Sequence, residues 1–460
     1  MKELRQLAQF ASGFRLEQAP EHVLKAARSC VLDSIGAALG AVGCDEIPRV
    51  CREIKMWAKS SSGLQAQVWG QGFELDVFQA LLLNGMMGHA LELDDVHTGS
   101  KSHIGAVVVT TAWTLADGQG GNGKDFLEAV IVGYEIMARV GMAMDVVSNR
   151  KRGWHTTGVI GTFGAAAAAG HLLGLDEEEM VSAFGMAGTQ SSGLWAFLAE
   201  GATCKKLHPA RAAVNGLTAA ILAKAGMTGP EHILDAQDGG LYRAVSDSWD
   251  LSVLADGLGR RFEILRIDKK PYPCCRTTHH AIDAALALRK ELGQKGREKI
   301  VDIRIDTYEV GVLQCGFTRY PESPVEAKFS IPYTVAAALV AGKVTQAEFT
   351  EEVVKNARIE ALAKKVSVVS DPMFSGRYPN RWGCRMTIRL ADGRTLVKQI
   401  DDISGSVLCP LTQEQEIMKF RDLAGVAMPD CEAERLIQAI GRIEEAFRLP
   451  KIWFCSCREE

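Results

Sequence analysis

The chain has 460 residues, of which 47% are hydrophobic and 23% charged, and its formal net charge is −4 at pH 7. These proportions are those of an ordinary folded protein and exclude a disordered, collagen-like or low-complexity chain. A chain whose positive and negative charges nearly balance is not typical of nucleic-acid binding. The sequence contains no run of about 18 apolar residues, so it predicts no membrane span. Because the N-terminus also lacks the pattern of a secretory signal and the twelve cysteines show no metal-binding spacing, we expect a cytoplasmic protein with reduced thiols.

Helical periodicity dominates the first 265 residues. Apolar residues recur at intervals of three or four, and glycine or proline stands at most of the joins. Long helices with short links and hardly any alternating runs indicate an all-α domain. The helices that we predict are 21–42, 76–89, 124–144, 157–173, 176–188 and 209–225.

The pattern changes near residue 262. Alternating runs predict strands at 262–267 and 300–306, and a hairpin at 384–390 and 395–400 that turns at Asp392-Gly393. Helical periodicity returns after about residue 403 and predicts helices at 412–423 and 430–446. We therefore predict a mainly α protein with a large all-helical domain built from both chain ends, 1–267 with 403–460, and an inserted, smaller α+β lid domain, 268–402. The cleft between two such bodies is the default place for a site.

The densest group of ionisable side chains lies where a predicted helix leads into a Gly- and Ser-rich loop. Three carboxylates and three histidines fall within fifteen positions. Such a set can bind a divalent metal ion, or it can hold a histidine in one tautomer for acid–base chemistry. The alternative interpretation is a polar helix end with capping aspartates and solvated histidines. The members are His89, Glu92, Asp94, Asp95, His97 and His103.

Four further segments carry groups suited to small anions. His155 precedes a helix rich in small residues, where unpaired N–H donors favour anions and lower the pKa of a histidine. Lys205 and His208 belong to a basic stretch before another helix, which suits a carboxylate but is also typical of a solvated face. The remaining candidates are Lys270, Cys275 and Arg276 in a Pro-rich turn, and Lys328 and Tyr333 near the start of a helix.

The motifs of several common enzyme classes are missing. No GxGxxG follows a strand, and GxxxxGK[ST], GxSxG and HExxH do not occur. Their absence removes the usual signals of nucleotide binding, serine hydrolysis and zinc proteolysis.

Together and in this order, the five segments resemble the MmgE/PrpD family, which contains 2-methylcitrate dehydratases, cis-aconitate decarboxylases and iminodisuccinate epimerase. The matching pieces run from Asp94–His97 with His103, through the segment around His155 and the lysines at 205 and 270, to residues 326–333. The resemblance covers essentially the whole chain. It implies a helical domain with an inserted α+β lid, a homodimer, a small polycarboxylate substrate, and neither a cofactor nor a metal.

The resemblance also implies roles for individual residues. His103, His155, Lys205 and Lys270 correspond to catalytic-cleft residues of the family. Substrate-binding roles are implied for Glu92, Asp94, Asp95, His97, His208, Cys275, Arg276, Lys328 and Tyr333. Glu92 stands where the decarboxylases carry an aspartate, and Cys275 where they carry a further histidine. The loop between Asp95 and His103 is also one residue longer than in those enzymes. The change to Cys275 and the longer loop both weaken a decarboxylase assignment.

The chemistry shared by the family is proton movement at a carbon next to a carboxylate. We expect cations to bind the substrate carboxylates while His103 and His155 exchange the proton, with Asp94 or Asp95 orienting an imidazole. The main hypothesis is a hydro-lyase that dehydrates a 2-methylcitrate-like hydroxy acid. The alternatives are an epimerase, a decarboxylase acting on a small polycarboxylate, and a homologue that binds carboxylates without turnover.

Overall fold

The computed structural model describes residues 1–44, 46–58, 63–297, 299–317 and 320–453. The chain divides into two compact units. Unit 1 comprises Met1–Trp195, Cys204–Ile267 and Thr412–Glu460, and unit 2 comprises Ala196–Thr203 and Asp268–Leu411. Within the described residues, none of the helices has both the length and the apolar character that crossing a membrane requires.

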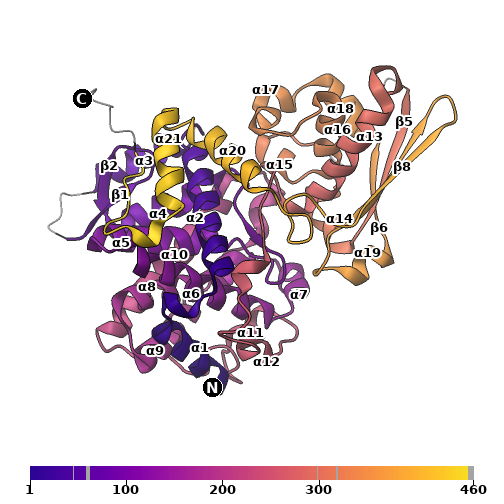
Figure 1. The fold of residues 1–460 in the computed structure, drawn as a ribbon. Coiled ribbons are helices and arrows are strands. Elements are labelled where there is room, and N and C mark those ends of the chain that lie inside the picture. The colour runs from indigo at the N-terminus through magenta and orange to yellow at the C-terminus, as the bar shows by residue number, and fades with distance from the viewer. Residues whose placement is uncertain (45, 59–62, 298, 318–319, 454–460) are drawn as a thin grey trace. The chain divides into compact units, whose positions relative to one another are not determined.

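Unit 1 is almost entirely helical (Figure 1). A hairpin joins β1 (Gln65–Val68) to β2 (Phe73–Asp76) in antiparallel register. The principal helices are α1 (Lys2–Gly13), α2 (Glu21–Ala41), α3 (Glu46–Trp57), α4 (Val77–Ala90), α5 (Gly105–Gln119), α6 (Gly123–Met142), α8 (Thr156–Leu173), α9 (Glu177–Gly188) and α10 (Leu207–Lys224), followed after unit 2 by α20 (Gln413–Ala424) and α21 (Asp430–Ile440). Shorter elements are η1 (Leu16–Gln18), α7 (Val146–Lys151), α11 (Leu241–Val245), α12 (Ser252–Ala255), η4 (Glu263–Arg266) and η7 (Ile443–Glu445).

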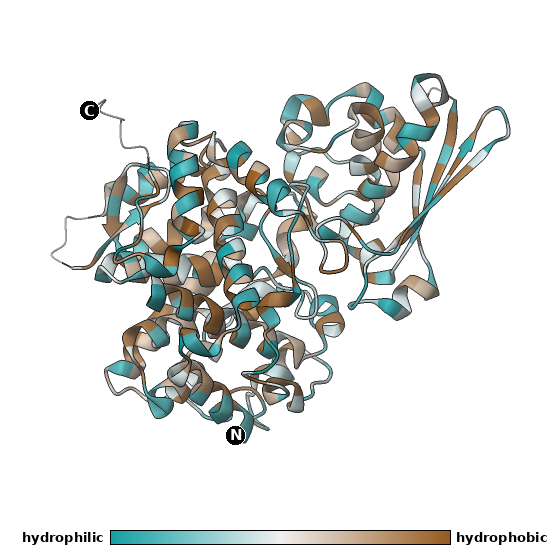
Figure 2. Ribbon diagram, in the orientation of Figure 1, coloured by the Kyte–Doolittle hydropathy of each residue, from teal (hydrophilic) through white to brown (hydrophobic). Residues whose placement is uncertain are grey.

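Helix α8 forms the centre of unit 1. Its residues from Thr156 to Gly170 are all buried, and it packs closely on α10, α6 and α5. Small residues permit this packing, because a Cβ on Gly216 of α10 would lie 2.4 Å from the Cβ of Ala165. A helix that is buried on all sides has apolar or small residues on every face. The outer helix α21, in contrast, has both hydrophilic and hydrophobic residues (Figure 2).

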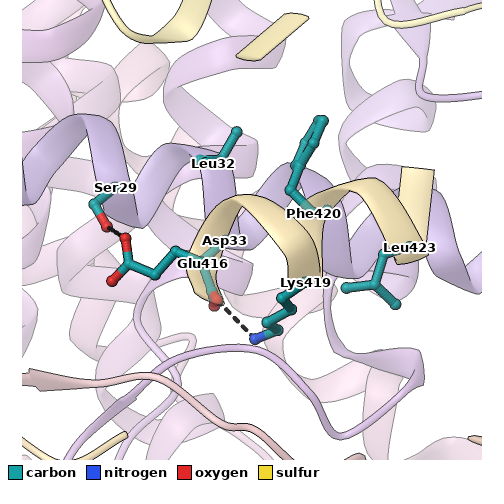
Figure 3. A pocket seen from close by; sticks show the side chains of 8 residues that line it. Ser29, Leu32, Asp33, Glu416, Lys419, Phe420 and Leu423 are labelled. Carbon is teal, nitrogen blue, oxygen red and sulfur yellow. Dashed lines mark hydrogen bonds and ion pairs between the residues drawn. The ribbon is translucent and has the colours of Figure 1, made fainter. Parts of the chain in front are cut away.

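The C-terminal helix α20 packs on α2 near the opposite end of the sequence. Lys419 donates to the carboxylate of Asp33 at 2.7 Å and to the backbone oxygen of Leu93 at 2.8 Å. Ser29 of α2 donates to Glu416, and Phe420 and Leu423 are among the other residues that line a small pocket here (Figure 3). Through Leu93, the last part of the chain holds the segment that follows α4.

Unit 2 combines a four-stranded sheet with helices. The strand order is β6-β5-β7-β8, with β5 parallel to β6 and the other pairs antiparallel. Helix α13 packs on the sheet, and α16 packs on α13. The strands are β5 (Ile300–Thr307), β6 (Val366–Ser370), β7 (Cys384–Leu390) and β8 (Thr395–Ile400), and the helices are η5 (Arg276–Thr278), α13 (His279–Arg297), α14 (Glu309–Cys315), α15 (Pro324–Lys328), α16 (Ile331–Ala341), η6 (Gln346–Phe349), α17 (Glu351–Val354), α18 (Ala357–Ala363) and α19 (Pro372–Arg377).

The predicted fold class, mainly α with a smaller α+β part, is confirmed, and the hairpin of β7 and β8 has the predicted bounds. The strand predicted at 262–267 is wrong. This segment forms the 3₁₀ turn η4 and only a two-residue strand, β4 (Ile267–Asp268). Its Glu263 is buried and accepts hydrogen bonds and ion pairs, so the alternation of apolar residues there does not reflect a sheet with one solvated face.

Candidate active site

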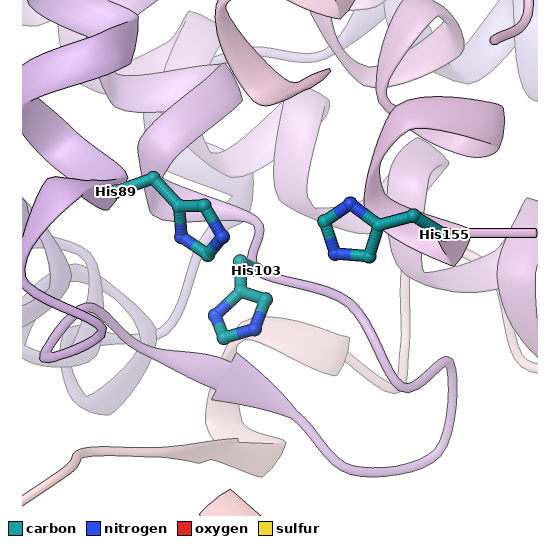
Figure 4. A group of neighbouring side chains, drawn as sticks. All are labelled: His89, His103 and His155. Atoms are coloured by element: carbon teal, nitrogen blue, oxygen red, sulfur yellow. The ribbon is translucent and has the colours of Figure 1, made fainter. Parts of the chain in front are cut away.

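Three histidines from three separate segments of unit 1 converge (Figure 4). His89 lies in the last turn of α4, His103 lies just before α5, and His155 is the N-cap residue of α8. The ring of His89 lies 4.5 Å from that of His103 and 6.0 Å from that of His155, measured between centroids. His89 and His155 are almost completely buried, while the side chain of His103 retains 13% of its exposure.

One carboxylate oxygen orients two of these rings. Oδ2 of Asp94 lies 2.8 Å from Nδ1 of His89 and 3.2 Å from Nδ1 of His103. His103 is held further by the backbone oxygen of Asp95, 3.0 Å from the same Nδ1, and its backbone N–H donates to Thr157 at the start of α8. A carboxylate in this position fixes the tautomer of each imidazole and directs the other nitrogen away.

His155 is positioned by a different set of neighbours. Its Nδ1 lies 2.9 Å from Nδ1 of His208, its backbone N–H donates to Gly193, and its ring packs edge-on against Trp195. Burial lowers the pKa of His155 well below its usual value, and the charge of Lys205 lowers it further. The direction agrees with the sequence-based expectation, but the cause is burial and a neighbouring cation rather than the end of the helix. Burial and Lys205 likewise lower the pKa of His208 to about 4.

Lys205 and Glu92 form a buried ion pair beside the histidines. Nζ of Lys205 donates to Oε1 of Glu92 at 2.5 Å, and the same oxygen lies 3.5 Å from Nε2 of His89. Glu92 has a φ of 57°, a left-handed conformation in which glycine is the usual residue after a helix end. The carboxylate is thus placed by a backbone conformation that costs energy, which is typical of functional positions.

Unlike Asp94, Asp95 does not use its carboxylate to orient an imidazole. The carboxylate binds groups of the neighbouring helices α5 and α6. It accepts hydrogen bonds from the hydroxyl of Tyr134 at 2.6 Å and from the N–H of Gly105 at 2.9 Å. Burial, with the nearby Asp33, raises the pKa of Asp95 to about 7. A Cβ on Gly105 would lie 2.1 Å from Oγ of Ser34, so only glycine allows α5 to begin here.

His97 belongs to another polar cluster. Its Nδ1 contacts the hydroxyl of Ser100 at 2.9 Å, and its Nε2 lies 3.4 Å from Oε2 of Glu263. These contacts join the loop after α4 to η4. They are the contacts of a histidine that supports the structure.

The candidates in unit 2 lie around the turn before α13. Lys270 is fully buried, and Cys275 accepts a hydrogen bond from the amide of Gln314 at 3.1 Å. The guanidinium of Arg276 contacts Asp268 at 3.1 Å and the backbone oxygen of Ser404 at 2.9 Å. These contacts of Arg276 stabilise the turn.

The last two candidates, Lys328 and Tyr333, have partners of their own in unit 2. Nζ of Lys328 lies 3.4 Å from the amide oxygen of Gln346, while its backbone oxygen accepts from the N–H of Cys275. Tyr333 is completely buried in α16, and its hydroxyl donates to the backbone oxygen of Glu348. The side chain of Tyr333 is part of the core of unit 2.

Two residues of this site have no assigned role in the sequence analysis. His89 stands in the ionisable cluster, and its spacing of five residues from Asp94 was a usable signal. Tyr134 lies in the middle of the apolar helix α6, and nothing in the sequence around it indicates a contact with Asp95.

The arrangement suits proton transfer near an anion. Two imidazoles are held in defined orientations by one carboxylate, a third ring lies within reach of both, and a buried ammonium group is adjacent. Such groups can remove a proton, return one, and stabilise negative charge that develops on a substrate carboxylate. The same three rings are also the only group among the described residues in which three or more potential metal-ligating side chains lie close together.

Comparison with known proteins identifies relatives along nearly the whole chain. The MmgE/PrpD N-terminal domain matches residues 5–254, and the MmgE/PrpD C-terminal domain matches residues 272–445. A cis-aconitate decarboxylase of Mus musculus is 28% identical, with 94% of this chain and 89% of that protein covered. A second cis-aconitate decarboxylase, of Aspergillus terreus, is 26% identical, with 98% of this chain and 96% of that protein covered. A 2-methylcitrate dehydratase of Cupriavidus necator is 24% identical, with 80% of this chain and 79% of that protein covered.

Proposed function

The chain belongs to the MmgE/PrpD family, and from this premise we propose that it is a lyase that dehydrates a small hydroxy di- or tricarboxylate resembling 2-methylcitrate. The observation that supports the proposal most directly is the pair of imidazoles, His89 and His103, oriented by Asp94 beside the buried Lys205 and close to His155. The relatives named as dehydratases and decarboxylases are consistent with lyase chemistry.

Dehydration needs a base and an acid at the same place. A carbon next to a carboxylate is a poor acid, so a cation must stabilise the charge that develops as the C–H bond breaks. In this proposal Lys205 supplies the cation, and one of His103 and His155 takes the proton. The other histidine protonates the hydroxyl that leaves as water, so that a C=C bond forms and no electrons are gained or lost. A role of Lys270 in binding a substrate carboxylate remains a prediction.

Decarboxylation is the second candidate. It is favoured by the cis-aconitate decarboxylases, which have higher identity and coverage than the dehydratases. This reaction breaks a bond to a carboxylate carbon and returns a proton to the substrate, so it needs a cation and one acid. Cys275, which stands where a histidine is expected in decarboxylases, and the longer loop between Asp95 and His103 weigh against it.

The test follows 2-methylcitrate and cis-aconitate by NMR in deuterated water. Dehydration forms an alkene from 2-methylcitrate, whereas decarboxylation releases carbon dioxide from cis-aconitate. Replacing His103 or His155 by Ala should lower turnover by roughly 10²–10⁴, and the same change at the exposed His232 should not. Near-normal turnover by a folded His103→Ala protein would contradict the assigned role, and a lack of any exchange or turnover would contradict the proposed enzyme.

A further inference from the structure

The histidine cluster of unit 1 has features that acid–base chemistry alone does not require. Each of the three rings offers one ligand nitrogen, and these nitrogen atoms lie within 4.8 Å of one another. The rings come from α4, the segment before α5, and the start of α8, so three separate parts of the fold place them around one point (Figure 4).

Each of the three rings has its Nδ1 in contact with another group of the protein. Nδ1 of His89 is engaged by the carboxylate of Asp94, Nδ1 of His103 by the backbone oxygen of Asp95, and Nδ1 of His155 by His208. Metal-ligating histidines almost always use one ring nitrogen in this way, because the partner fixes the tautomer and makes the other nitrogen a better ligand. Nε2 is then the ligand atom of each ring.

His89 provides an independent observation. Its side chain is fully buried, and within the described residues its Nε2 has no hydrogen-bond partner. The nearest anion is Oε1 of Glu92 at 3.5 Å, which already accepts from Lys205. A buried polar atom without a hydrogen bond is costly, and a ligand that accepts its lone pair would remove that cost.

We infer that His89, His103 and His155 form a binding site for a divalent transition-metal ion, with Zn²⁺ as the preferred ion. Three imidazoles and no thiolate suit Zn²⁺ and its neighbours in the first transition row, and a three-histidine set leaves a fourth position for water or a substrate carboxylate. Zinc–nitrogen bonds of about 2.0–2.1 Å require the three nitrogens to approach one another by up to about 1.5 Å.

The surrounding charges set the strength of binding. The carboxylates of Asp94 and Glu92 favour a cation, whereas the ammonium group of Lys205 opposes it. A bound ion occupies the imidazole lone pairs that proton transfer uses, so the ion inhibits the enzyme. This inhibition rests on the proposed function, but the binding itself does not.

The binding test measures metal directly. Chelator-treated protein is titrated with Zn²⁺ in competition with a chromophoric chelator, and Co²⁺ absorption reports the coordination geometry. We expect one ion per chain, at least tenfold weaker binding in His89→Gln and His155→Gln, and about 10–100-fold weaker binding in Asp94→Asn. The matched control is His22→Gln, which changes an exposed histidine and should bind as the wild type does.

Unfolding temperatures establish which variants are folded. Wild-type affinity in both folded variants, His89→Gln and His155→Gln, would overturn the site, and so would binding that is lost in His22→Gln. Measurements of turnover with and without Zn²⁺ distinguish the proposed metal site from the proposed enzymatic function. Zn²⁺ that binds at the histidines without inhibiting would contradict the roles of His103 and His155 in turnover. Loss of turnover in His103→Ala without any Zn²⁺ binding to the wild type would overturn the metal site alone.

Discussion

A single oxygen of Asp94 contacts two imidazoles, whereas the neighbouring Asp95 uses its carboxylate for Tyr134 and Gly105. The two aspartates are adjacent in sequence and chemically identical, yet only one of them orients the rings. Either aspartate could orient an imidazole as far as the sequence indicates, because consecutive residues in a loop can point in any direction. Coordinates are needed to tell the orienting residue from the one that supports the backbone.

The first prediction concerns Asp94. Replacing it by Asn keeps the shape but removes the charge that holds both rings in one tautomer, so we expect turnover to fall by about 10²–10⁴ while the fold is retained. Steady-state kinetics and thermal unfolding measure the two effects. Asp238→Asn, at an exposed position, is the control. A folded Asp94→Asn protein with wild-type turnover would show that the carboxylate does not orient the catalytic groups.

The second prediction concerns acid stability. Burial alone would raise the pKa of Glu263, but its contacts with His97 and Arg261 lower it to about 2. Because this folded-state pKa lies below the ordinary value of 4.5 for a glutamate, the carboxylate stabilises the fold above about pH 4.5, and that contribution is lost as the pH falls toward 2.

Glu263→Gln should therefore lower the free energy of unfolding at pH 7 by about 3 kcal/mol, and the difference from wild type should shrink between pH 5 and pH 3. Urea unfolding at a series of pH values measures this, with the exposed Glu53→Gln as control. A difference that stays constant over this range would refute the assignment.

At the scale of elements, the helices of unit 1 could be predicted well because long amphipathic and apolar periods are strong signals. Helices α2, α8 and α20 begin and end within two residues of their predicted bounds. The hairpin of β1 and β2 was not predicted, since its strands have only four residues, and neither was β6, whose alternation is weak. Periodicity also carries no information on which distant element each helix touches.

The contact of α20 with α2 leads to the third prediction. Lys419→Met leaves Asp33 buried without its cation and frees the oxygen of Leu93, which directly precedes Asp94. We expect a loss of about 3 kcal/mol in the free energy of unfolding, together with lower turnover. The control, Arg421→Met on the same helix, breaks an exposed pair with Glu434 and should cost less than about 1 kcal/mol. Equal effects of the two changes would contradict a special role of Lys419.

At the scale of the whole molecule, unit 1 is made from both ends of the sequence. Phe420, Leu436 and Ile443 from the last segment are buried in the same core as the N-terminal helices. The backbone of Ala446 accepts from Gly123 at the start of α6, and that of Ile452 donates to Gln67 in β1. The return of helical periodicity after residue 403 indicated this segment as helical, but the individual contacts could not be predicted.

The fourth prediction follows from this shared core. Removing residues 412–460 exposes apolar surface worth roughly 1.5–3 kcal/mol for each large side chain, and the sum is comparable to the stability of a typical domain. We expect the shortened chain to be insoluble or to lack a cooperative unfolding transition, as judged by circular dichroism against the full chain. A soluble product with the wild-type transition would mean that the N-terminal helices form a core by themselves.

The interrupted order of unit 1 also affects how the protein emerges from the ribosome. All the residues of unit 2 are synthesised before α20 is, so this unit can form while the helical body still lacks part of its core. Until α20 arrives, the loop with Asp94 lacks its anchor at Leu93, and apolar surfaces of α2 stay uncovered. The side chains of the histidine cluster are thus all synthesised early, but the loop that carries Asp94 gains its contact with Lys419 only near the end of translation.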